Sequence, residues 1–351
     1  MNIQASIPMA FPRRSQLAEK SVSVLAGDVG GTKTNLALFK ASHQQVELVQ
    51  EATYPSSKYP SCIDIVKDFL QISRIERPDR ICLGVAGPVI QGKVEITNLS
   101  WDLDKRDITS ATGVADVSLI NDLEATAYGL AGLGEEDFID IVKGSATAGG
   151  NIAIIAPGTG LGEAGLYWDG SSYHPFPTEG GHTDFSPRTS LDIELMQFLQ
   201  KKYPVVSWEK VIAGPGIVDI YEFLCQLRNR QKPGWLEQAM SQDDPSAVIS
   251  EAALAERDPE CIETMQLFVR FLARESSNLV LKMKATGGLY LGGGIPPKIS
   301  ALLQQNVFYD NFLDNDRMQN LVKKVPVRII LNNKTALIGA ALYGAYGARD
   351  N

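Results

Sequence analysis

The feature that most constrains this chain is a glycine-rich turn between two short apolar runs. Residues 22–25 predict a buried strand, the turn occupies residues 27–32, and residues 35–39 predict a second strand. Glycines let backbone N–H groups approach a ligand without side chains in the way. Thr32 and Thr34 add hydroxyl groups. The turn therefore has the chemistry of a site for phosphate oxygens.

Within this turn, Gly30, Gly31 and Thr32 are the residues that we expect to contact a nucleotide. Asp28 places one carboxylate beside them, and Mg²⁺ in phosphate sites takes one or two carboxylates and keeps several waters. Asp28 is therefore the predicted Mg²⁺ ligand. A P-loop is a competing interpretation, but the sequence lacks one glycine of that motif and continues as a strand instead of a helix. An ordinary glycine hairpin is the other.

A second copy of the pattern decides between these interpretations. Residues 152–156 predict another buried strand, and a glycine/threonine turn and a further strand follow. Gly158, Thr159 and Gly160 are the predicted phosphate contacts of this copy. The spacing of residues 160–165 also fits a dinucleotide-binding fingerprint, but no helix opens after it. Two such hairpins predict an α/β chain with the duplicated actin-like ATPase (ribonuclease H-like) fold, with two domains around a cleft.

Composition narrows the class of partner. The chain has 351 residues, more than a typical single domain, and 44% of them are hydrophobic. Its net charge of −8 argues against nucleic acid and anionic membranes, which attract basic surfaces. No apolar run has the length of a membrane span. Four scattered cysteines fit a reducing cytoplasm. Residues 1–20 lack the apolar segment of a signal peptide and are predicted to form a disordered tail.

The strongest candidate for acid–base chemistry is Asp122. Residues 117–120 predict a strand that delivers Asn121 and Asp122 at its carboxyl end, where a helix follows. A kinase that acts on a sugar hydroxyl needs a carboxylate within reach of the proton that it removes. The alternative is that Asp122 only caps the helix. The paired hairpins favour the catalytic interpretation, with Asn121 as a partner of neighbouring hydroxyls.

Three later segments complete the sequence-based site. Glu179 and His182 flank two glycines, and this carboxylate and imidazole offer the acceptors and donors that a polyhydroxylated ligand requires. Gly293 and Gly294 follow a predicted strand, in a loop that can lie flat against a base or ribose. Residues 229–245 are polar and contain proline, which predicts an exposed loop.

Taken together, these motifs resemble the bacterial glucokinase family of group A, the Escherichia type, which is distinct from the repressor-ORF-kinase (ROK) family. The resemblance covers residues 22–346 and rests on several motifs in the family's order. They are Gly27-Asp28-Val29-Gly30-Gly31-Thr32, Ile120-Asn121-Asp122, Gly158-Thr159-Gly160-Leu161-Gly162, Glu179-Gly180-Gly181-His182-Thr183-Asp184-Phe185 and Gly214-Pro215-Gly216. ROK kinases add a cysteine zinc cluster downstream of the histidine motif, and no cysteine lies between Cys82 and Cys225.

The resemblance implies ATP-dependent phosphorylation of glucose at its 6-hydroxyl, with Mg²⁺ as cofactor. It implies that Asp122 is the general base. It also implies sugar ligands (Asn121, Asp122, Glu179, His182 and Glu209) and a nucleotide contact at Gly214. It further implies a homodimer, a small domain of residues 21–132 and 332–351, and a large domain of residues 133–331.

Other functions are compatible with the same fold. One is a kinase for another hexose, and another is a sugar-sensing regulator without turnover. A regulator of genes needs a nucleic-acid-binding module, which an acidic chain of this length does not offer. An actin-like assembly ATPase has no use for Asn121 and Asp122 together with Glu179 and His182.

Overall fold

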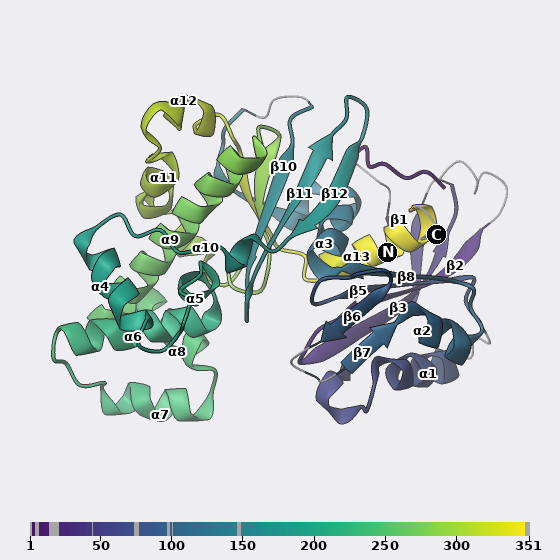
Figure 1. Cartoon of the computed structure of the whole chain (residues 1–351), viewed down its shortest axis with the longest axis horizontal. Coiled ribbons are helices and arrows are strands. Elements are labelled where there is room, and N and C mark those ends of the chain that lie inside the picture. The colour runs from purple at the N-terminus through teal and green to yellow at the C-terminus, as the bar shows by residue number, and fades with distance from the viewer. Residues whose placement is uncertain are drawn as a thin grey trace. The chain divides into compact units, whose positions relative to one another are not determined.

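Two six-stranded sheets built on one plan organise the chain. Figure 1 shows the ribbon of the whole chain with the labels of its main elements. The structure is a computed structural model and describes residues 2–3, 7–13, 21–43, 45–73, 77–96, 99, 101–145 and 149–347. The chain divides into two compact units. Unit 1 comprises residues 1–137, 166–177 and 332–351, and unit 2 comprises residues 138–165 and 178–331.

Unit 1 contains the first sheet and the helices that cover it. Its strands occur in the order β1-β4-β3-β2-β5-β8. Their bounds are Asn2–Ile3 (β1), Val22–Val29 (β2), Lys33–Ala41 (β3), Val46–Pro55 (β4), Arg80–Val85 (β5) and Asp116–Asn121 (β8). A small hairpin is made by Lys93–Ile96 (β6) and Trp101–Asp104 (β7). The helices are Cys62–Ser73 (α1), Lys105–Thr112 (α2), Asp122–Gly129 (α3) and Thr335–Tyr346 (α13).

The second sheet has the order β12-β11-β10-β13-β14-β9. Its strands are Phe138–Val142 (β9), Ile152–Pro157 (β10), Leu161–Trp168 (β11), Tyr173–Thr178 (β12), Gly288–Leu291 (β13) and Val327–Ile330 (β14). The end of β11, from Leu166 on, and all of β12 except Thr178 belong to unit 1.

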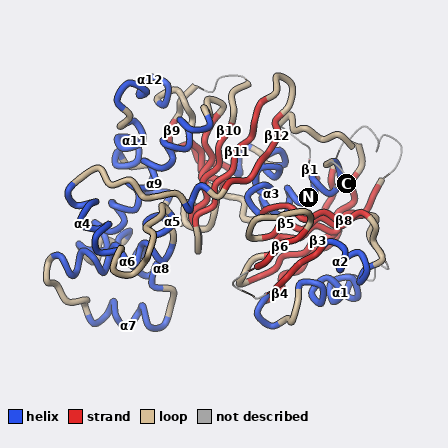
Figure 2. Tube along the Cα trace, in the orientation of Figure 1, coloured by secondary structure: helices blue, strands red, loops and turns tan. Residues whose placement is uncertain are grey.

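The helices of unit 2 are separated from this sheet in the sequence, since most of them lie between β12 and β13. They are Ser190–Leu199 (α4), Glu209–Ile212 (α5), Gly214–Leu227 (α6), Gly234–Gln242 (α7), Pro245–Leu254 (α8), Pro259–Met283 (α9), Ser300–Leu303 (α10), Asn306–Leu313 (α11) and Gln319–Val322 (α12). The tube in Figure 2 separates this run of helices from the strands by colour. None of the helices that the structure describes is both long and apolar enough to cross a membrane.

The duplication predicted from the two hairpins is present in the strand pairing. In the first sheet β2 pairs with β3 antiparallel and with β5 in parallel, and β5 pairs with β8 in parallel. In the second sheet β10 lies beside β11 and pairs with β13 in parallel, and β13 pairs with β14 in parallel. The predicted α/β fold with two related sheets is therefore confirmed. The first sheet has an additional edge strand, β1, beside β4. The second sheet has an additional strand, β9, at the opposite edge, beside β14.

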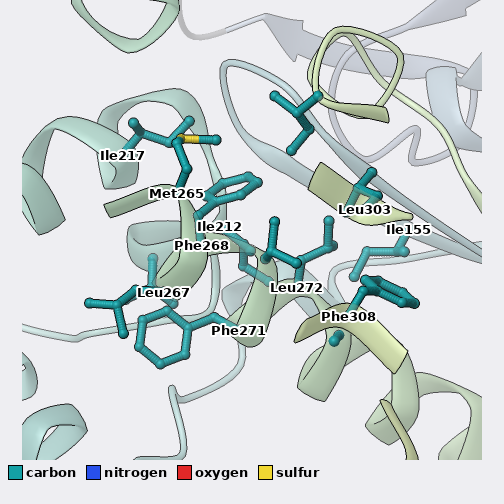
Figure 3. Packing of buried hydrophobic residues seen from close by; sticks show 14 of the residues in the cluster. Ile155, Ile212, Ile217, Met265, Leu267, Phe268, Phe271, Leu272, Leu303 and Phe308 are labelled. Carbon is teal, nitrogen blue, oxygen red and sulfur yellow. The ribbon is translucent and has the colours of Figure 1, made fainter. Parts of the chain in front are cut away.

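Each unit has its own hydrophobic core. In unit 2 the long helix α9 packs its apolar side chains against the sheet and the neighbouring helices, and Figure 3 shows Phe268, Phe271 and Leu272 among them. Helix α9 begins at the cap Asp258, which accepts from Cys261 N, and ends where Lys284 turns left-handed with φ of 49°. The first unit has a separate cluster that includes Leu25, Phe69 and Leu83.

Helix α13 explains why both ends of the chain contribute to unit 1. It follows the last strand of the second sheet, yet packs on α3. A β-carbon at Gly339 would overlap Ala125 O, and one at Gly129 would overlap Thr335 O, so the two helices approach at backbone distance. This contact fixes α3, whose first residue is Asp122, against the first sheet.

The disordered tail predicted for residues 1–20 is wrong for residues 2–3 and 7–13, and residues 1, 4–6 and 14–20 lie outside the described residues. Strand β1 pairs with β4, and Ile3 and Met9 are buried. Arg13 is also buried and pairs with Asp116 at 2.5 Å, while its backbone N–H donates to Tyr346 O. Buried side chains, an ion pair and backbone hydrogen bonds hold the described parts of this segment, and their partners are distant in the sequence, so no local pattern reveals them.

The exposed loop predicted for residues 229–245 is confirmed only for residues 229–233 and is wrong for most of its length. Residues 234–242 form α7, in which Leu236 is fully buried. Helix α8 then begins at the cap Asp244, whose side chain accepts from Ser246 N, with a proline in its first turn. Aspartate followed by proline is a helix-start signal, which the polar composition of the segment obscured.

Candidate active site

The first hairpin presents Asp28 at the end of β2. Asp28 pairs in register with Asn35 of β3 and with Gly84 of β5. Asn35 Nδ2 donates to Asp28 Oδ2 at 3.2 Å, and Asn35 Oδ1 accepts from Thr53 at 2.8 Å. Burial raises the pKa of the Asp28 carboxyl above its ordinary value, with Asn35 and Lys33 acting in the opposite direction. A nearby cation would offset this desolvation, so the carboxylate suits a metal-bound phosphate.

The turn of this hairpin is closed by a chain of hydroxyl groups. Ser56 Oγ donates to Gly30 O at 2.8 Å and lies 3.0 Å from Thr34 Oγ1. Thr34 is fully buried. Its hydroxyl group therefore closes the turn and is not available to a phosphate, contrary to the expectation from the sequence. Thr32 is exposed at the tip of the turn, and its contact with a nucleotide stays a prediction.

Asn121 and Asp122 lie where β8 passes into α3, as predicted. The helix cap is Asn121, because its Oδ1 accepts from Leu123 N at 2.9 Å and from Glu124 N at 3.3 Å. Its Nδ2 donates to Gly87 O at 3.1 Å. Asp122 is the first residue of the helix, is partly exposed and accepts from Leu123 N at 2.9 Å. The interpretation of Asp122 as the cap is therefore wrong, because Asn121 occupies the cap position.

In unit 2 the second hairpin borders a cavity of about 670 Å³. Four of the predicted nucleotide contacts line it: Gly158, Thr159, Gly214 and Gly294. Gly214 N donates to Gly158 O at 2.9 Å, so the start of α6 is fixed to the hairpin turn. The remaining walls come from α6, from α8 along its whole length and from the loop after β13. They include Pro215, Ile217, Val218, Leu254, Ile295 and Ile299 as apolar residues and Asp244, Ser246, Ser250, Glu251 and Lys298 as polar ones.

This lining has the character of a small-molecule site, since such pockets are mostly apolar with a few polar groups that fix orientation. Apart from Thr159, sequence reasoning missed the polar residues of that lining. Asp244 falls in the segment 229–245 that the sequence predicts to be a loop, and Ser246 follows directly after that segment. Glu251 and Lys298 are ordinary helix and loop residues in the sequence, so only the fold brings them to one cavity.

Gly160 and Gly293 do not line this cavity. A β-carbon at Gly160 would lie 2.8 Å from Glu209 Oε2, so this glycine makes room for that carboxylate. Gly293 has φ of +78°, and a β-carbon there would overlap Pro157 O. Both glycines therefore shape the hairpin, and their predicted nucleotide contacts stay untested.

The loop with Glu179 and His182 lies on the first residues of β11. Residues Gly180–His182 form a single 3-10 turn. A β-carbon at Gly181 would overlap Leu161 O, and one at Gly180 would overlap Glu163 Oε2, so the two glycines allow the turn to touch the strand. The side chains of Glu179 and His182 are 56% and 60% exposed, with 3.9 Å between Oε2 and Nε2. Both are thus presented to solvent by a turn with a fixed backbone.

Glu209 reaches the same part of β11. Its Oε2 accepts from Leu161 N at 3.3 Å, and its Oε1 lies 3.0 Å from Lys210 Nζ. The residues just before Glu209 are joined to the loop that carries Glu179 and His182. Trp208 N donates to Thr183 O and Phe185 N donates to Val206 O, each at 2.9 Å. Leu161 therefore contacts Glu209 through its N–H and the glycine turn through its carbonyl. Unit 2 gathers Glu179, His182 and Glu209 beside its hairpin.

Each unit thus carries a separate set of predicted residues. Unit 1 holds Asp28, Gly30, Gly31, Thr32, Asn121 and Asp122, and unit 2 holds the others. Among the residues that the structure describes, no group of three or more His, Cys, Asp or Glu side chains is arranged to hold a metal ion. A metal at Asp28 would therefore depend on ligands from a bound nucleotide and water, which fits Mg²⁺.

Comparison with known proteins agrees with this arrangement. A family model described as Glucokinase matches residues 25–346. A glucokinase of Nostoc punctiforme is 39% identical over 339 residues, which is 92% of this chain and 98% of the relative. The crystal structure of a glucokinase from an Antarctic psychrotroph matches with a TM-score of 0.79 and 31% identity, over 92% of this chain and 98% of that one.

A more distant structure shares the fold alone. The glucokinase of Balamuthia mandrillaris, solved in complex with glucose, matches with a TM-score of 0.77 at 23% identity and covers 93% of this chain and 94% of its own. The family model extends over most of the sequence and includes both hairpins, Asn121 and Asp122, and the Glu179–His182 turn. On the matches to the family model and to the relatives above 30% identity, the chain belongs to the glucokinase family.

Proposed function

We propose that this protein transfers the γ-phosphoryl group of ATP to the 6-hydroxyl of D-glucose. The observation that carries the proposal is the convergence of Glu179, His182 and Glu209 on the first residues of β11, next to a glycine/threonine hairpin. Two carboxylates and an imidazole provide acceptors and a donor for several sugar hydroxyls. A cavity suited to a nucleoside borders the same hairpin.

The catalytic role is assigned to Asp122. In the proposed reaction its carboxylate accepts the proton of the 6-hydroxyl, the sugar oxygen forms a bond to the γ-phosphorus, and the bond from that phosphorus to the bridging oxygen of ADP breaks. Its place as the first helical residue supports this role, because Asn121 already caps the helix. Asn121 has a second amide N–H beyond the one given to Gly87, and we assign it to a sugar oxygen.

The nucleotide is assigned to the two hairpins and the cavity. Gly158, Thr159, Gly214 and Gly294 line the cavity, which supports a nucleoside there. Gly30, Gly31 and Thr32 are assigned to the phosphates, and Gly160 and Gly293 to the shape of the second hairpin and its neighbourhood. Mg²⁺, when bound with ATP, neutralises phosphate charge, and Asp28 is its proposed protein ligand.

The finer placement within the family is also a proposal. We assign the chain to the Escherichia-type group and not to the ROK family, because the described residues contain no cysteine-based metal cluster. We further propose a cytoplasmic homodimer with two domains that close around the substrates. Closure would exclude water, so that glucose and not water receives the phosphoryl group.

The test is a coupled assay of the purified protein with ATP and Mg²⁺, which follows formation of glucose 6-phosphate. Mannose, glucosamine and fructose serve as competing acceptors, and ADP and polyphosphate serve as competing donors. Glucose with ATP should give the highest kcat/KM. Equal or greater efficiency with another hexose or donor would contradict the proposal.

A binding experiment checks the sugar site independently of turnover. His182→Ala should weaken glucose binding by about 1–3 kcal/mol in calorimetric titration, because sugar hydroxyls lose a partner. His174→Ala is a matched control, since His174 is also a half-exposed histidine but is paired with Asp169. Equal affinity for glucose in the wild type and His182→Ala would assign His182 a structural role.

A further inference from the structure

Glu163 is a buried acid that the proposed mechanism does not use. It lies in β11 two residues after Leu161, and only 1% of its surface is exposed. Its Oε1 is buried and makes no hydrogen bond to any residue that the structure describes. A carboxyl group in such a place is costly unless it is neutral, because burial of an unpaired charge is far more unfavourable than burial of an acid.

The carboxyl group of Glu163 lies directly under the turn that carries Glu179 and His182. A β-carbon at Gly180 would overlap Glu163 Oε2, so the backbone of the turn rests on this side chain. Thr178 joins the same two residues, since its hydroxyl donates to Glu163 O at 3.1 Å and accepts from Gly180 N at 3.2 Å. Gly180 is therefore supported by both the side chain and the main chain of Glu163.

We propose that Glu163 is a positioning residue for glucose binding, whose neutral carboxyl group supports Gly180 and holds the Glu179–His182 turn in its binding shape. This inference rests on the proposed function, since it assigns a partner to the sugar ligands of that site. Glu163 itself does not contact the sugar in this account. It acts through the backbone on which Glu179 and His182 stand.

The charges around Glu163 favour its neutral form. Burial, and next the negative charge of Glu275, raise the pKa of Glu163 to about 8, while Lys282 acts in the opposite direction. Burial raises the pKa of Glu275 of α9 as well, but Glu275 has partners that act in the opposite direction, namely Asn278 Nδ2 at 2.8 Å, Lys282 Nζ at 3.1 Å and the more distant charge of Arg188. Of the two buried acids, the negative charge therefore belongs to Glu275 and the proton to Glu163.

Ionisation of Glu163 would disturb the turn. It would place a second negative charge beside Glu275 and beneath Gly180, whose N–H is already given to Thr178. Relief requires that the turn rise or that water enter, and either change moves Glu179 and His182. Because the neutral form is the one that binds, glucose affinity should be constant at neutral pH and fall as the pH rises through about 8.

The first test is calorimetric titration of the wild-type protein with glucose alone across this pH range. If only the neutral form binds, the Kd should be about tenfold higher near pH 9 than near pH 7. Glu163→Gln keeps the shape of the side chain and remains neutral, so its Kd should stay flat. In the coupled assay the wild-type change should appear in the KM for glucose and not in kcat.

Glu275→Gln is the matched control, since it neutralises the neighbouring buried acid but leaves the contact with Gly180. It should move the midpoint of the wild-type pH profile to lower pH, because loss of the nearby negative charge makes Glu163 easier to ionise. This result does not need a folded Glu163 variant. A further variant, Glu163→Ala, should raise the KM at every pH, because it removes the support.

Failure of this inference is distinct from failure of the proposed function. No binding or phosphorylation of glucose by the wild type near pH 7 would overturn the proposed function. Tight binding near pH 7 with a Kd that does not change up to about pH 9 would overturn the role of Glu163 alone. The same holds if Glu163→Gln repeats the wild-type pH profile, or if Glu275→Gln leaves its midpoint in place.

Discussion

The two glycine/threonine hairpins share a backbone plan but are held in different ways. The first turn is held by neutral hydroxyl groups, with Ser56 between Thr34 and the carbonyl of Gly30, and Thr34 is fully buried. The second turn is held by a charged side chain from outside the hairpin, because Glu209 accepts from Leu161 N and covers Gly160. The first hairpin is thus closed by the hydroxyl groups of Thr34 and Ser56, and the second by Glu209, a residue assigned to the sugar.

This difference indicates how a duplicated scaffold divides its functions. The strand pairing of β2, β5 and β8 recurs in β10, β13 and β14, so the backbone was repeated. The acids were not repeated in the same places. Asp28 stands before the first turn, whereas residues 157–160 of the second turn contain no acid. We therefore expect loss of the Asp122 carboxylate in unit 1 to affect the chemical step, and changes at Glu179, His182 and Glu209 in unit 2 to affect glucose binding.

The sharpest test of this division is Asp122→Asn. We expect kcat to fall by about two to four orders of magnitude, because a general base is lost, while the Kd for glucose changes little. The helix should be unaffected, since Asn121 is its cap. Coupled assays give kcat, calorimetry gives Kd, and circular dichroism is the control for folding. Unchanged turnover would remove Asp122 from the chemistry and end the proposed division.

Two glycines at equivalent positions allow a direct comparison of the two copies of the fold. Gly87 follows β5 and Gly293 follows β13 by the same number of residues, and their φ angles are +116° and +78°. A β-carbon at Gly87 would meet ordinary contacts at 3.4 Å, whereas one at Gly293 would overlap Pro157 O. Gly87→Ala should cost about 1–3 kcal/mol of unfolding free energy, and Gly293→Ala about 3–4 kcal/mol, because overlap adds to strain.

Urea unfolding of both variants measures this difference. Gly294→Ala is a control next to the more sensitive site, since a β-carbon at Gly294 has no atom within 4 Å. It should unfold like the wild type. If Gly87→Ala proves the more destabilised of the equivalent pair, the second hairpin is less tightly packed than its contacts indicate.

The hydroxyl chain of the first hairpin gives a smaller effect. Ser56→Ala leaves Thr34 Oγ1 buried without its partner and releases Gly30 O, which should cost about 1–3 kcal/mol of stability. Thr34→Val with Ser56→Ala removes both partners and should recover part of this loss. Denaturant unfolding measures both variants. Glucose affinity should not change in either, and a loss of glucose binding would show that the two hairpins are not independent in function.

Local patterns in the sequence predicted the elements that depend on neighbours in the chain. The strand, turn and strand of each hairpin and the junction at Asn121 and Asp122 were confirmed, because glycine turns and apolar runs are local signals. The choice of cap at that junction was not accessible, since Asn and Asp are equally good caps. Only the backbone geometry assigns it to Asn121.

The parts that the sequence could not predict are made by contacts between distant residues. The cavity beside the second hairpin is assembled from α6, α8 and the loop after β13, and α8 begins in a segment whose polarity resembled a loop. Glu163 looks like one polar residue of a strand, and only its position under Gly180 gives it a role. Arg13 meets Asp116 across 103 positions. No spacing rule connects such pairs.

The smallest predicted effect concerns the residue that joins hairpin and sugar in unit 2. Glu209→Gln keeps an acceptor for Leu161 N but exchanges a charged acceptor for a neutral one and loses the ion pair with Lys210. Hydrogen bonds to charged groups exceed neutral ones by about 1 kcal/mol, so glucose should bind about fivefold more weakly.

Stability should change by less than about 1 kcal/mol in Glu209→Gln, because the lost ion pair is partly exposed and such pairs contribute little. Lys210→Met is the matched control, since it removes the ion pair but keeps the charge of Glu209, and it should bind glucose like the wild type.

The KM for ATP of Glu209→Gln is the measurement that tests whether Glu209 also holds the second turn. If Glu209 holds the second turn as well as the sugar, the KM for ATP of Glu209→Gln should rise together with its KM for glucose. Ser56→Ala at the first turn should leave the KM for glucose unchanged. A rise in the KM for glucose alone would mean that Glu209 does not couple the second turn to the sugar. The two hairpins, although held differently, would then be equally independent of the sugar.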